Sequence, residues 1–373
     1  MYFFRILTRK KLFSSASAER RKKEEDCYLK NGGAVLEELL ALCDGNCRIP
    51  IRYFTATEIE RAIKHSKSKM KFSHVSMVTG SLDNRPVLVR FSRCQFTNIH
   101  RDIAITAQMS HLKNVLRLVG CCLEFEEPVM VYEYVEAITL SDLLFREGDH
   151  KTKRSLSWGK RLRIANEVAS AVVFLHTEFT TPIIHRDIKP HKVIIDQNSG
   201  VAKIIDFSLS ISLPPGELEV QDAVLCGTFW YLDPEYASLG IVTQKTDVYS
   251  FGVLLFQLLT GKESLDSMQS NTEEGTVMDR VDSRIYEETT NFKDPNPPTM
   301  VELYIKESNA IDIADPTFLE QHGIEIQQQL EDYLDLVKKC TTYKGENRPY
   351  MIHVAKELRR IENCYRALTI YQN

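Results

Sequence analysis

Apolar residues recur at helical spacing near the start of the chain. Five of them lie in one short stretch: Val35, Leu36, Leu39, Leu40 and Leu42. Because residues three and four apart share one face of a helix, this spacing predicts a short amphipathic helix over residues 34–43. A second helix should begin after Thr55, whose hydroxyl can cap it while Glu58 returns the bond in a capping box. Together they predict a helical N-terminal extension over residues 29–67, which either packs on the following domain or docks a partner.

The pattern changes to strands and then to long helices further along the chain. Runs of apolar and β-branched residues predict strands over residues 87–91, 193–196 and 201–205. Apolar residues at helical spacing predict helices over residues 248–260, 327–340 and 351–368. Residues 263–298 are polar and acidic without sustained apolar periodicity, and this composition predicts a long loop.

Composition narrows the class of protein. The chain has 373 residues, 43% of them hydrophobic, which is ordinary for a globular protein. Its net charge of −4 gives no reason to expect binding to nucleic acid. Nine cysteines without framework spacing indicate a reducing compartment, and the adjacent Cys121 and Cys122 are expected to be buried. No apolar run reaches the roughly 18 residues of a membrane span, so we expect a cytoplasmic protein.

The first 28 residues are predicted to form a basic flexible tail. The stretch holds eight basic side chains: Arg5, Arg9, Lys10, Lys11, Arg20, Arg21, Lys22 and Lys23. Apolar groups such as Phe3 and Leu7 stand beside these charges. The tail is therefore either solvated or in contact with an anionic membrane surface, which would place the protein at the plasma membrane as a peripheral protein. It also has some features of a transit peptide.

Candidate chemistry lies in residues 183–206. A short apolar run leads into a turn that holds Asp187 and Lys189, the predicted strand over residues 193–196 follows, and the second strand, over residues 201–205, leads to Asp206. In this arrangement Asp187 can accept a proton from a substrate hydroxyl, and Lys189 can neutralise a phosphoryl group in transit. Asp206 can hold Mg²⁺. The spacing indicates phosphoryl transfer.

At this stretch the chain resembles the eukaryotic protein kinases. Three more motifs follow in the family's order: the Asp-Phe-Ser of residues 206–208, CGTFWYLDPE at 226–235 and TDVYSFG at 246–252. The resemblance implies an α+β, two-lobed kinase fold with an upper lobe over 68–135, a lower lobe over 136–365 and a tail over 366–373. It also implies a nucleotide-binding hinge at Glu133 and Val135, and a structural ion pair between Glu235 and Arg348.

The upper lobe departs from the family at the nucleotide-binding positions. Kinases cover the ATP phosphates with a glycine-rich loop, because only glycine lets the backbone approach closely. This chain has no glycine between Asn46 and Thr79, and the equivalent positions fall near Met70, Phe72 and Val75. Arg90 stands where the family has the ATP-contacting lysine, and Asp102 stands at the position of its glutamate partner. We expect these two to keep an ion pair while losing the positioning of phosphate.

The lower lobe departs at one metal ligand. Lys192 occupies the position at which the family uses asparagine to bind Mg²⁺, and an ammonium group repels a cation unless it replaces that cation by touching phosphate itself. Ser208 replaces the flexible glycine after Asp206 and should restrict the activation segment. In that segment, Arg186 could pair with Glu217, Glu219 or Asp222 in place of a phosphate.

Other stretches resemble one plant group of these kinases. Residues 54–60 (FTATEIE), 120–124 (GCCLE) and 131–134 (VYEY) are similar to plant receptor-like kinases near the wall-associated type. Residues 29–33 (LKNGG) and 206–214 (DFSLSISLP) resemble the cytoplasmic group called ZED-related kinases. That resemblance implies a pseudokinase adaptor for a coiled-coil nucleotide-binding leucine-rich-repeat (NLR) immune receptor.

Three functions follow from these motifs. The first is a pseudokinase adaptor in plant immunity that requires no cofactor, binds an NLR receptor and engages a second cytoplasmic kinase altered by a pathogen effector. The second is a weak Ser/Thr protein kinase with ATP and Mg²⁺, using Asp187 as base, Asp206 as metal ligand and Arg90 or Lys192 on phosphate. The third is a nucleotide-free binding module with unrelated partners. Thr228 favours Ser/Thr specificity in the second case.

Overall fold

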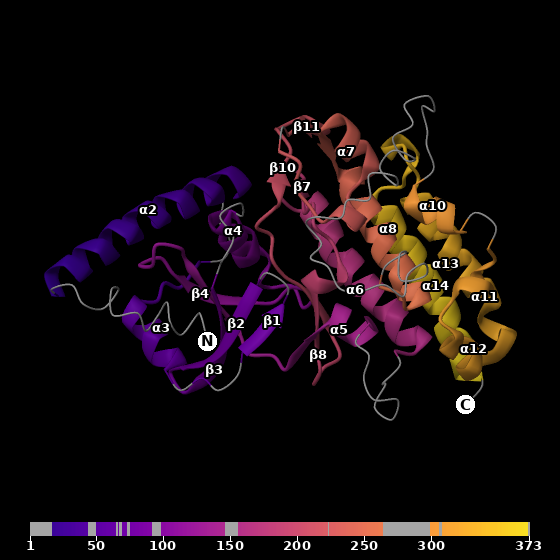
Figure 1. Ribbon diagram of the computed structural model, residues 1–373, viewed down its shortest axis with the longest axis horizontal. Coiled ribbons are helices and arrows are strands. Elements are labelled where there is room, and N and C mark those ends of the chain that lie inside the picture. The colour runs from indigo at the N-terminus through magenta and orange to yellow at the C-terminus, as the bar shows by residue number, and fades with distance from the viewer. Residues whose placement is uncertain are drawn as a thin grey trace, which may run out of the picture. The chain divides into compact units, whose positions relative to one another are not determined.

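The computed structural model describes residues 17–43, 50–64, 66, 69–72, 75–91, 98–145, 156–222, 224–263, 299–305 and 308–371. The chain divides into two compact units. Unit 1 takes in the chain up to Val135 together with Asp206–Ser208. Unit 2 consists of Glu136–Ile205 and the chain from Leu209 onward. Unit 1 is built around a sheet and unit 2 mainly from helices (Figure 1), so the predicted two-lobed α+β fold with an N-terminal helix is confirmed.

Unit 1 is organised on a five-stranded antiparallel sheet with the order β1-β2-β3-β5-β4. Its strands are β1 (Lys69–Phe72), β2 (Val75–Leu82), β3 (Arg85–Phe91), β4 (Leu118–Cys122) and β5 (Val129–Glu133). The central strand β3 is buried from Val87 to Phe91. Its apolar side chains pack with those of β5 and of helix α3 (Ala56–Ile63), which has the predicted capping box between Thr55 and Glu58. Cys121 and Cys122 are fully buried, as expected.

The N-terminal helix α2 spans Ser17–Cys43. The prediction of a helix limited to residues 34–43 was wrong, and so was the flexible tail for residues 17–28; residues 1–16 lie outside the described residues. Helix α2 lies against helix α4 (Ile99–Met109), as Figure 1 shows. Ion pairs of Arg20 with Glu24 and with Glu60 of α3 hold the basic half of α2 in place. The contact with Glu60 joins distant segments of the chain, and such contacts stabilise a helix that its glycines would otherwise weaken.

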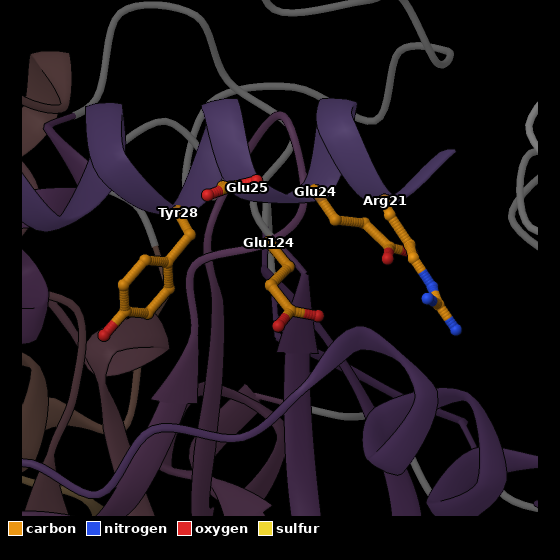
Figure 2. Close-up of a pocket in the computed structure, with 5 residues that line it drawn as sticks. All are labelled: Arg21, Glu24, Glu25, Tyr28 and Glu124. Atoms are coloured by element: carbon orange, nitrogen blue, oxygen red, sulfur yellow. The ribbon is translucent and has the colours of Figure 1, made fainter. Parts of the chain in front are cut away.

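A pocket of about 340 Å³ lies where α2 passes over the segment after β4 (Figure 2). Its lining comes mostly from α2 and consists of Arg21, Glu24, Glu25, Tyr28 and Glu124. Glu124 also accepts a hydrogen bond of 2.6 Å from the backbone N–H of Ala56, the first residue of α3. With three carboxylates and one guanidinium, the pocket carries negative charge.

Unit 2 contains short sheets and a set of packed helices. The sheets are β6-β8-β9, β10-β7 and β11-β12, formed from β6 (Ala137–Thr139), β7 (Ile183–Ile184), β8 (Val193–Asp196), β9 (Ala202–Ile204), β10 (Ile211–Ser212), β11 (Glu219–Gln221) and β12 (Ile241–Thr243). The helices are α5 (Leu140–Phe145), α6 (Trp158–Thr177), α7 (Pro234–Leu239), α8 (Gln244–Thr260), α10 (Met300–Ile305), α11 (Ala310–Ile313), α12 (Pro316–His322), α13 (Gln327–Cys340) and α14 (Met351–Tyr371). Helix α8 is buried almost throughout. At Gly252 of α8 a Cβ atom would stand 2.7 Å from the Cβ of Cys340, so glycine permits the close approach of α8 to α13.

The closing helices agree closely with the sequence pattern. Helix α13 has the predicted bounds, whereas α8 begins four residues earlier, where Thr243 caps its first turn. Helix α14 continues to Tyr371, so the predicted tail from residue 366 was wrong for its described part. An ion pair between Arg366 and Glu362, one helical turn apart, accompanies this last part of the helix. Residues 264–298, most of the predicted loop, lie outside the described residues.

Candidate functional site

The first part of the candidate site is an ion pair inside unit 1. Arg90 lies near the end of β3 and Asp102 in the first turn of α4, and both side chains are buried. Nη1 of Arg90 lies 2.5 Å from Oδ2 of Asp102. The structure therefore contains the pair that the sequence predicts, in which a longer cation compensates for a shorter carboxylate. Thr106, one turn later on α4, donates its hydroxyl to Oδ1 of Asp102 at 3.0 Å.

The same arginine also holds Asp206. Nη2 of Arg90 lies 2.7 Å from Oδ1 of Asp206, and the hydroxyl of Ser208 donates to this oxygen at 2.7 Å. The backbone N–H of Phe207 donates to Oδ1 of Asp102 at 3.0 Å. Asp206 itself has a φ of +70°, a left-handed conformation that few residues other than glycine adopt. The planar fork of arginine can bridge two carboxylates in this way, which a lysine ammonium cannot match.

This cluster carries one positive charge for two carboxylates. Burial lowers the pKa of Arg90, but Asp206 and Asp102 outweigh it, so the pKa lies well above its usual value and the guanidinium stays charged. Burial raises the pKa of Asp102, and Asp206 adds to this effect, although Arg90 opposes it. Tyr132 of β5 accepts a hydrogen bond of 3.3 Å from Nη1 of Arg90. The Nε atom of Arg90 is buried with no hydrogen-bond partner among the described residues.

The strand pair β1 and β2 occupies the place of a glycine-rich loop. The two strands pair antiparallel, with Phe72 opposite Val75. Met70, Phe72 and Val75, predicted at the glycine positions, thus belong to a regular hairpin, and their side chains lie outside the described residues. The predicted hinge residues lie at the end of unit 1, where Glu133 pairs with Arg117 at 3.3 Å and Val135 is buried.

The second part of the candidate site lies in unit 2. One oxygen of Asp187 accepts a hydrogen bond of 2.6 Å from the hydroxyl of Thr228. The other oxygen lies 3.1 Å from Nζ of Lys189 and 3.4 Å from Nζ of Lys192. Lys189 also donates to the hydroxyl of Thr228. All three predicted residues of this loop thus meet at one carboxylate, which is buried together with both lysines.

The backbone of this loop is anchored by Asp247 of α8. Its two carboxylate oxygens accept hydrogen bonds from the N–H groups of His185 (2.8 Å) and Arg186 (2.9 Å). His176 of α6 makes a further hydrogen bond of 2.9 Å. Burial would raise the pKa of Asp247, but the contacts with both histidines lower it below its usual value. The anchor accommodates Arg186 at a φ of +67°, which is a strained conformation for a non-glycine residue.

The activation segment is held by an ion pair without phosphate. Arg186 donates to Asp222, one of the three acidic residues that the sequence offered, and also donates to the backbone carbonyl of Leu209 at 2.6 Å. The segment around Asp222 forms β11, which pairs with β12. The carboxylate of Asp222 therefore accepts the charge-assisted hydrogen bond from Arg186 that a phosphoryl group could accept in its place.

The predicted ion pair between Glu235 and Arg348 was wrong. Arg348 is buried and pairs with Asp233 at 2.7 Å. Asp233 is the N-cap residue of α7 and is itself buried, so both charged groups of this ion pair are shielded from water. Glu235 is less buried and accepts a hydrogen bond of 2.8 Å from the N–H of Gly345.

The residues present do not fit Mg²⁺ in the way that the family resemblance implies. Among the described residues, no group of three or more His, Cys, Asp and Glu side chains could hold a metal ion. Oδ1 of Asp206, the predicted ligand, already accepts bonds from Arg90 and Ser208. In unit 2, the other predicted ligand position is held by Lys192, whose ammonium group cannot coordinate a cation.

Sequence reasoning missed the contact from Arg90 to Asp206 and the bond from Ser208 to Asp206. Ser208 was singled out only as a less flexible replacement for glycine, although a hydroxyl two residues after a carboxylate is a known local hydrogen-bonding pattern. The partner of Arg90 lies 116 residues away, so no local pattern could have revealed it.

Comparison with known proteins supports the resemblance. A model of the protein kinase domain matches residues 85–358. The serine/threonine-protein kinase ZRK4 of Arabidopsis thaliana is 35% identical over 349 residues, which cover 90% of this chain and 92% of that protein. The non-functional pseudokinase ZED1 of the same plant is 35% identical over 354 residues, covering 90% and 96%. Wall-associated receptor kinase-like 1, also from A. thaliana, is 33% identical over 344 residues, covering 90% of this chain and 43% of that protein.

Proposed function

This chain belongs to the protein kinase family, and we propose that it is a pseudokinase, which acts by binding other proteins rather than by transferring phosphate. The observation that carries this proposal is the bridge from Arg90 to both Asp102 and Asp206. This bridge occupies the carboxylate of Asp206, at the position where a kinase binds its metal ion. The names of its relatives include both serine/threonine-protein kinases and non-functional pseudokinases.

The energetic argument concerns what a nucleotide would have to displace. To bind Mg²⁺ through Asp206, the chain would have to break a buried ion pair and a hydrogen bond from Ser208. Breaking a buried pair costs about 3–5 kcal/mol when one charge is left uncompensated. That cost would be subtracted from the binding free energy of the nucleotide, which supports a function that requires neither ATP nor Mg²⁺.

The proposed partners are a coiled-coil NLR immune receptor and a second cytoplasmic kinase altered by a pathogen effector. Similarity to the pseudokinase ZED1 supports this role, and so does the form of the activation segment. Large apolar side chains are exposed on and beside this segment: Leu218, Val224, Leu225, Phe229 and Leu239. Since the pair of Arg186 and Asp222 fixes the segment, these side chains form a prearranged surface for another protein.

The proposal places the protein in the cytoplasm, with membrane contact through its basic N-terminus. Among the described residues, no helix is long and apolar enough to cross a membrane. Four of the eight basic residues that suggested membrane contact, together with the apolar Phe3 and Leu7, fall in residues 1–16, outside the described residues. Binding to vesicles with and without anionic lipid, compared between the full chain and a chain that begins at Ser17, tests this part.

Co-purification tests the adaptor role. The full chain should co-purify with a coiled-coil NLR receptor in the absence of nucleotide, and with the effector-modified kinase only when the activation-segment surface is intact. Leu225→Asp should lose the kinase and keep the receptor. Leu303→Asp, at an exposed leucine on α10, is the matched control and should keep both. Loss of neither partner in Leu225→Asp would remove the support for this surface.

One observation favours a second function, a weak Ser/Thr kinase. Asp187, Lys189 and Thr228 meet in unit 2 as a catalytic base, a phosphate-neutralising cation and a positioning hydroxyl would. ATP-dependent thermal stabilisation distinguishes the two, because a ligand that binds the folded state raises its melting temperature. The pseudokinase proposal expects no shift with ATP, with or without Mg²⁺ or Mn²⁺. A shift that requires the metal ion, and that Asp206→Asn abolishes, would favour the kinase.

A further inference from the structure

A row of apolar side chains is exposed along the outer face of α2. Leu29, Leu36 and Leu40 are 66%, 56% and 52% exposed. With 3.6 residues per turn, these leucines and Gly33 project within about 60° of one another. We call Leu29, Gly33, Leu36 and Leu40 the α2 stripe.

The described residues of unit 1 do not use this stripe for packing. The opposite face of α2 supplies the buried residues Asn31, Val35, Leu39 and Leu42. Asn31 donates from its side chain to the carbonyl groups of Leu123 and Phe125, at 2.9 Å each. Glu38 accepts hydrogen bonds from Asn98 and Arg101 at the start of α4. Polar residues at the stripe would leave all these contacts intact, so its leucines indicate a contact with another molecule.

Gly33 adds a second indication. Glycine in the middle of a helix costs about 1 kcal/mol relative to alanine. At Gly32 an added Cβ atom would meet Leu123 at 3.8 Å, whereas at Gly33 it would meet nothing within 4 Å. Neither packing nor a special φ therefore requires glycine at residue 33. It leaves a notch in the stripe into which a large side chain of a partner fits.

We propose that the α2 stripe binds the same stripe of a second copy of this chain, with the two helices antiparallel. In that alignment Leu36 of each copy enters the notch at Gly33 of the other, and Leu29 of each copy packs on Leu40 of the other. The contact is isologous, so it closes on itself as a two-fold dimer. The four positions of the stripe are spaced by four, three and four residues, and such spacing is the pattern by which paired helices interlock.

Charges beside the stripe select the antiparallel direction. Lys30 and Glu37 flank it on one side, both exposed, and neither makes an ion pair with another described residue. In the antiparallel pair, Lys30 of each copy approaches Glu37 of the other, so two equivalent contacts between opposite charges form. A parallel pair would place these flanks on opposite sides of the contact, without this attraction, and would place the two notches opposite each other, leaving a void.

The stripe also limits the strength of the dimer. From Leu29 to Leu40 it is about 17 Å long at 1.5 Å per residue. Charged residues, Lys22 and Asp26, occupy the same face towards the N-terminus. The buried area is therefore at the low end for a specific interface, and we expect a dimer that forms with rising concentration and dissociates on dilution.

Sedimentation of the full chain over a range of concentrations tests the proposal. The wild type should pass from a mass of 42.9 kDa to twice that value as concentration rises. Leu36→Glu should remain at the monomer mass. Leu303→Glu, at the exposed α10 leucine of unit 2, is the matched control and should dimerise as the wild type does. Gly33→Leu should keep the helix and lose the dimer, because it fills the notch.

Exchanging the charges at Lys30 and Glu37 gives a result, restored dimerisation in a mixture of two variants, that unfolding of a variant could not produce. Lys30→Glu alone and Glu37→Lys alone should each weaken self-association at least tenfold. An equimolar mixture of these two variants should dimerise again, because each then meets the opposite charge on both sides. A monomeric wild type at every concentration would overturn the proposal. So would a dimer that Leu36→Glu leaves unchanged, or a mixture that stays as weak as its components.

Discussion

Replacing Arg90 by methionine is the sharpest test of the buried charge cluster. Arg90→Met keeps much of the length of the side chain but removes the cation between Asp102 and Asp206, whose carboxylates lie 2.5 and 2.7 Å from its nitrogens. Removing one partner of a buried pair costs about 3–5 kcal/mol. Two carboxylates are left here, so we expect the free energy of unfolding to fall by a value towards the upper end of this range.

The loss should depend on pH with a definite sign. Without Arg90, burial and mutual repulsion raise the pKa of the two carboxyl groups above the unfolded value of about 3.9. A raised pKa in the folded state means that stability increases as pH falls and is lost as pH rises through the folded-state pKa. Arg90→Met should therefore recover stability between about pH 7 and pH 5. The wild type, in which Arg90 opposes the rise at Asp102, should recover less.

Urea unfolding followed by far-ultraviolet circular dichroism measures this effect, and hydrogen exchange of β3 and α4 locates it in unit 1. Arg117→Met is the matched control, because Arg117 pairs with Glu133 in the same unit but its side chain is 60% exposed. Exposed pairs contribute about 0–1 kcal/mol. If Arg90→Met is as stable as Arg117→Met, or if its stability does not change between pH 7 and 5, the account of the cluster is refuted.

Three further changes have defined outcomes. Asp247→Asn should lower the free energy of unfolding, measured in urea, by about 2–4 kcal/mol, because an amide group would face backbone donors. The folded state lowers the pKa of Asp247, so the stability advantage of the wild type should persist above about pH 4 and shrink below it. Asp222→Ala should release Arg186 and speed chymotryptic cleavage at the exposed Leu218 and Leu225 of the activation segment several-fold. Glu38→Ala should break the pair with Arg101 (2.8 Å) and raise hydrogen exchange at the start of α4.

Each of these changes has a control that alters a similar side chain without the contact. Asp335→Asn removes an exposed pair on α13 and should cost little. Glu217→Ala removes an exposed acidic residue of the activation segment and should leave cleavage unchanged. Glu25→Ala, on the exposed side of α2, should leave exchange at α4 unchanged. Equal effects in a variant and its control would contradict the corresponding contact.

The sequence predicted those elements whose stability is local. The bounds of α13 and β8 agree with the pattern, because apolar spacing alone defines them. The capping box of α3 was predicted for the same reason, since Thr55 and Glu58 are three residues apart. The length of α2 was not predicted, because its basic half is held by Glu60 on another helix.

In the candidate site, too, some contacts could be predicted from the sequence and others depend on the folded chain. The ion pair of Arg90 with Asp102 could be predicted, because both stand at positions that form an ion pair in the family and the longer cation compensates for the shorter carboxylate. The contact of Arg90 with Asp206 could not, because it joins residues far apart in the chain through the reach of one guanidinium. The pairing of Arg348 with Asp233 instead of Glu235 was missed because it depends on burial, which distinguishes two neighbouring carboxylates only in the folded chain.

Transfer of radiolabelled phosphate from ATP to a generic protein substrate tests the central claim most directly. The assay compares the folded wild type with Asp187→Ala, in Mg²⁺ and in Mn²⁺, beside an active kinase as the positive control. The account predicts that wild type and Asp187→Ala incorporate equally little label. Incorporation by the wild type that disappears in Asp187→Ala would contradict it and would identify the protein as a working Ser/Thr kinase.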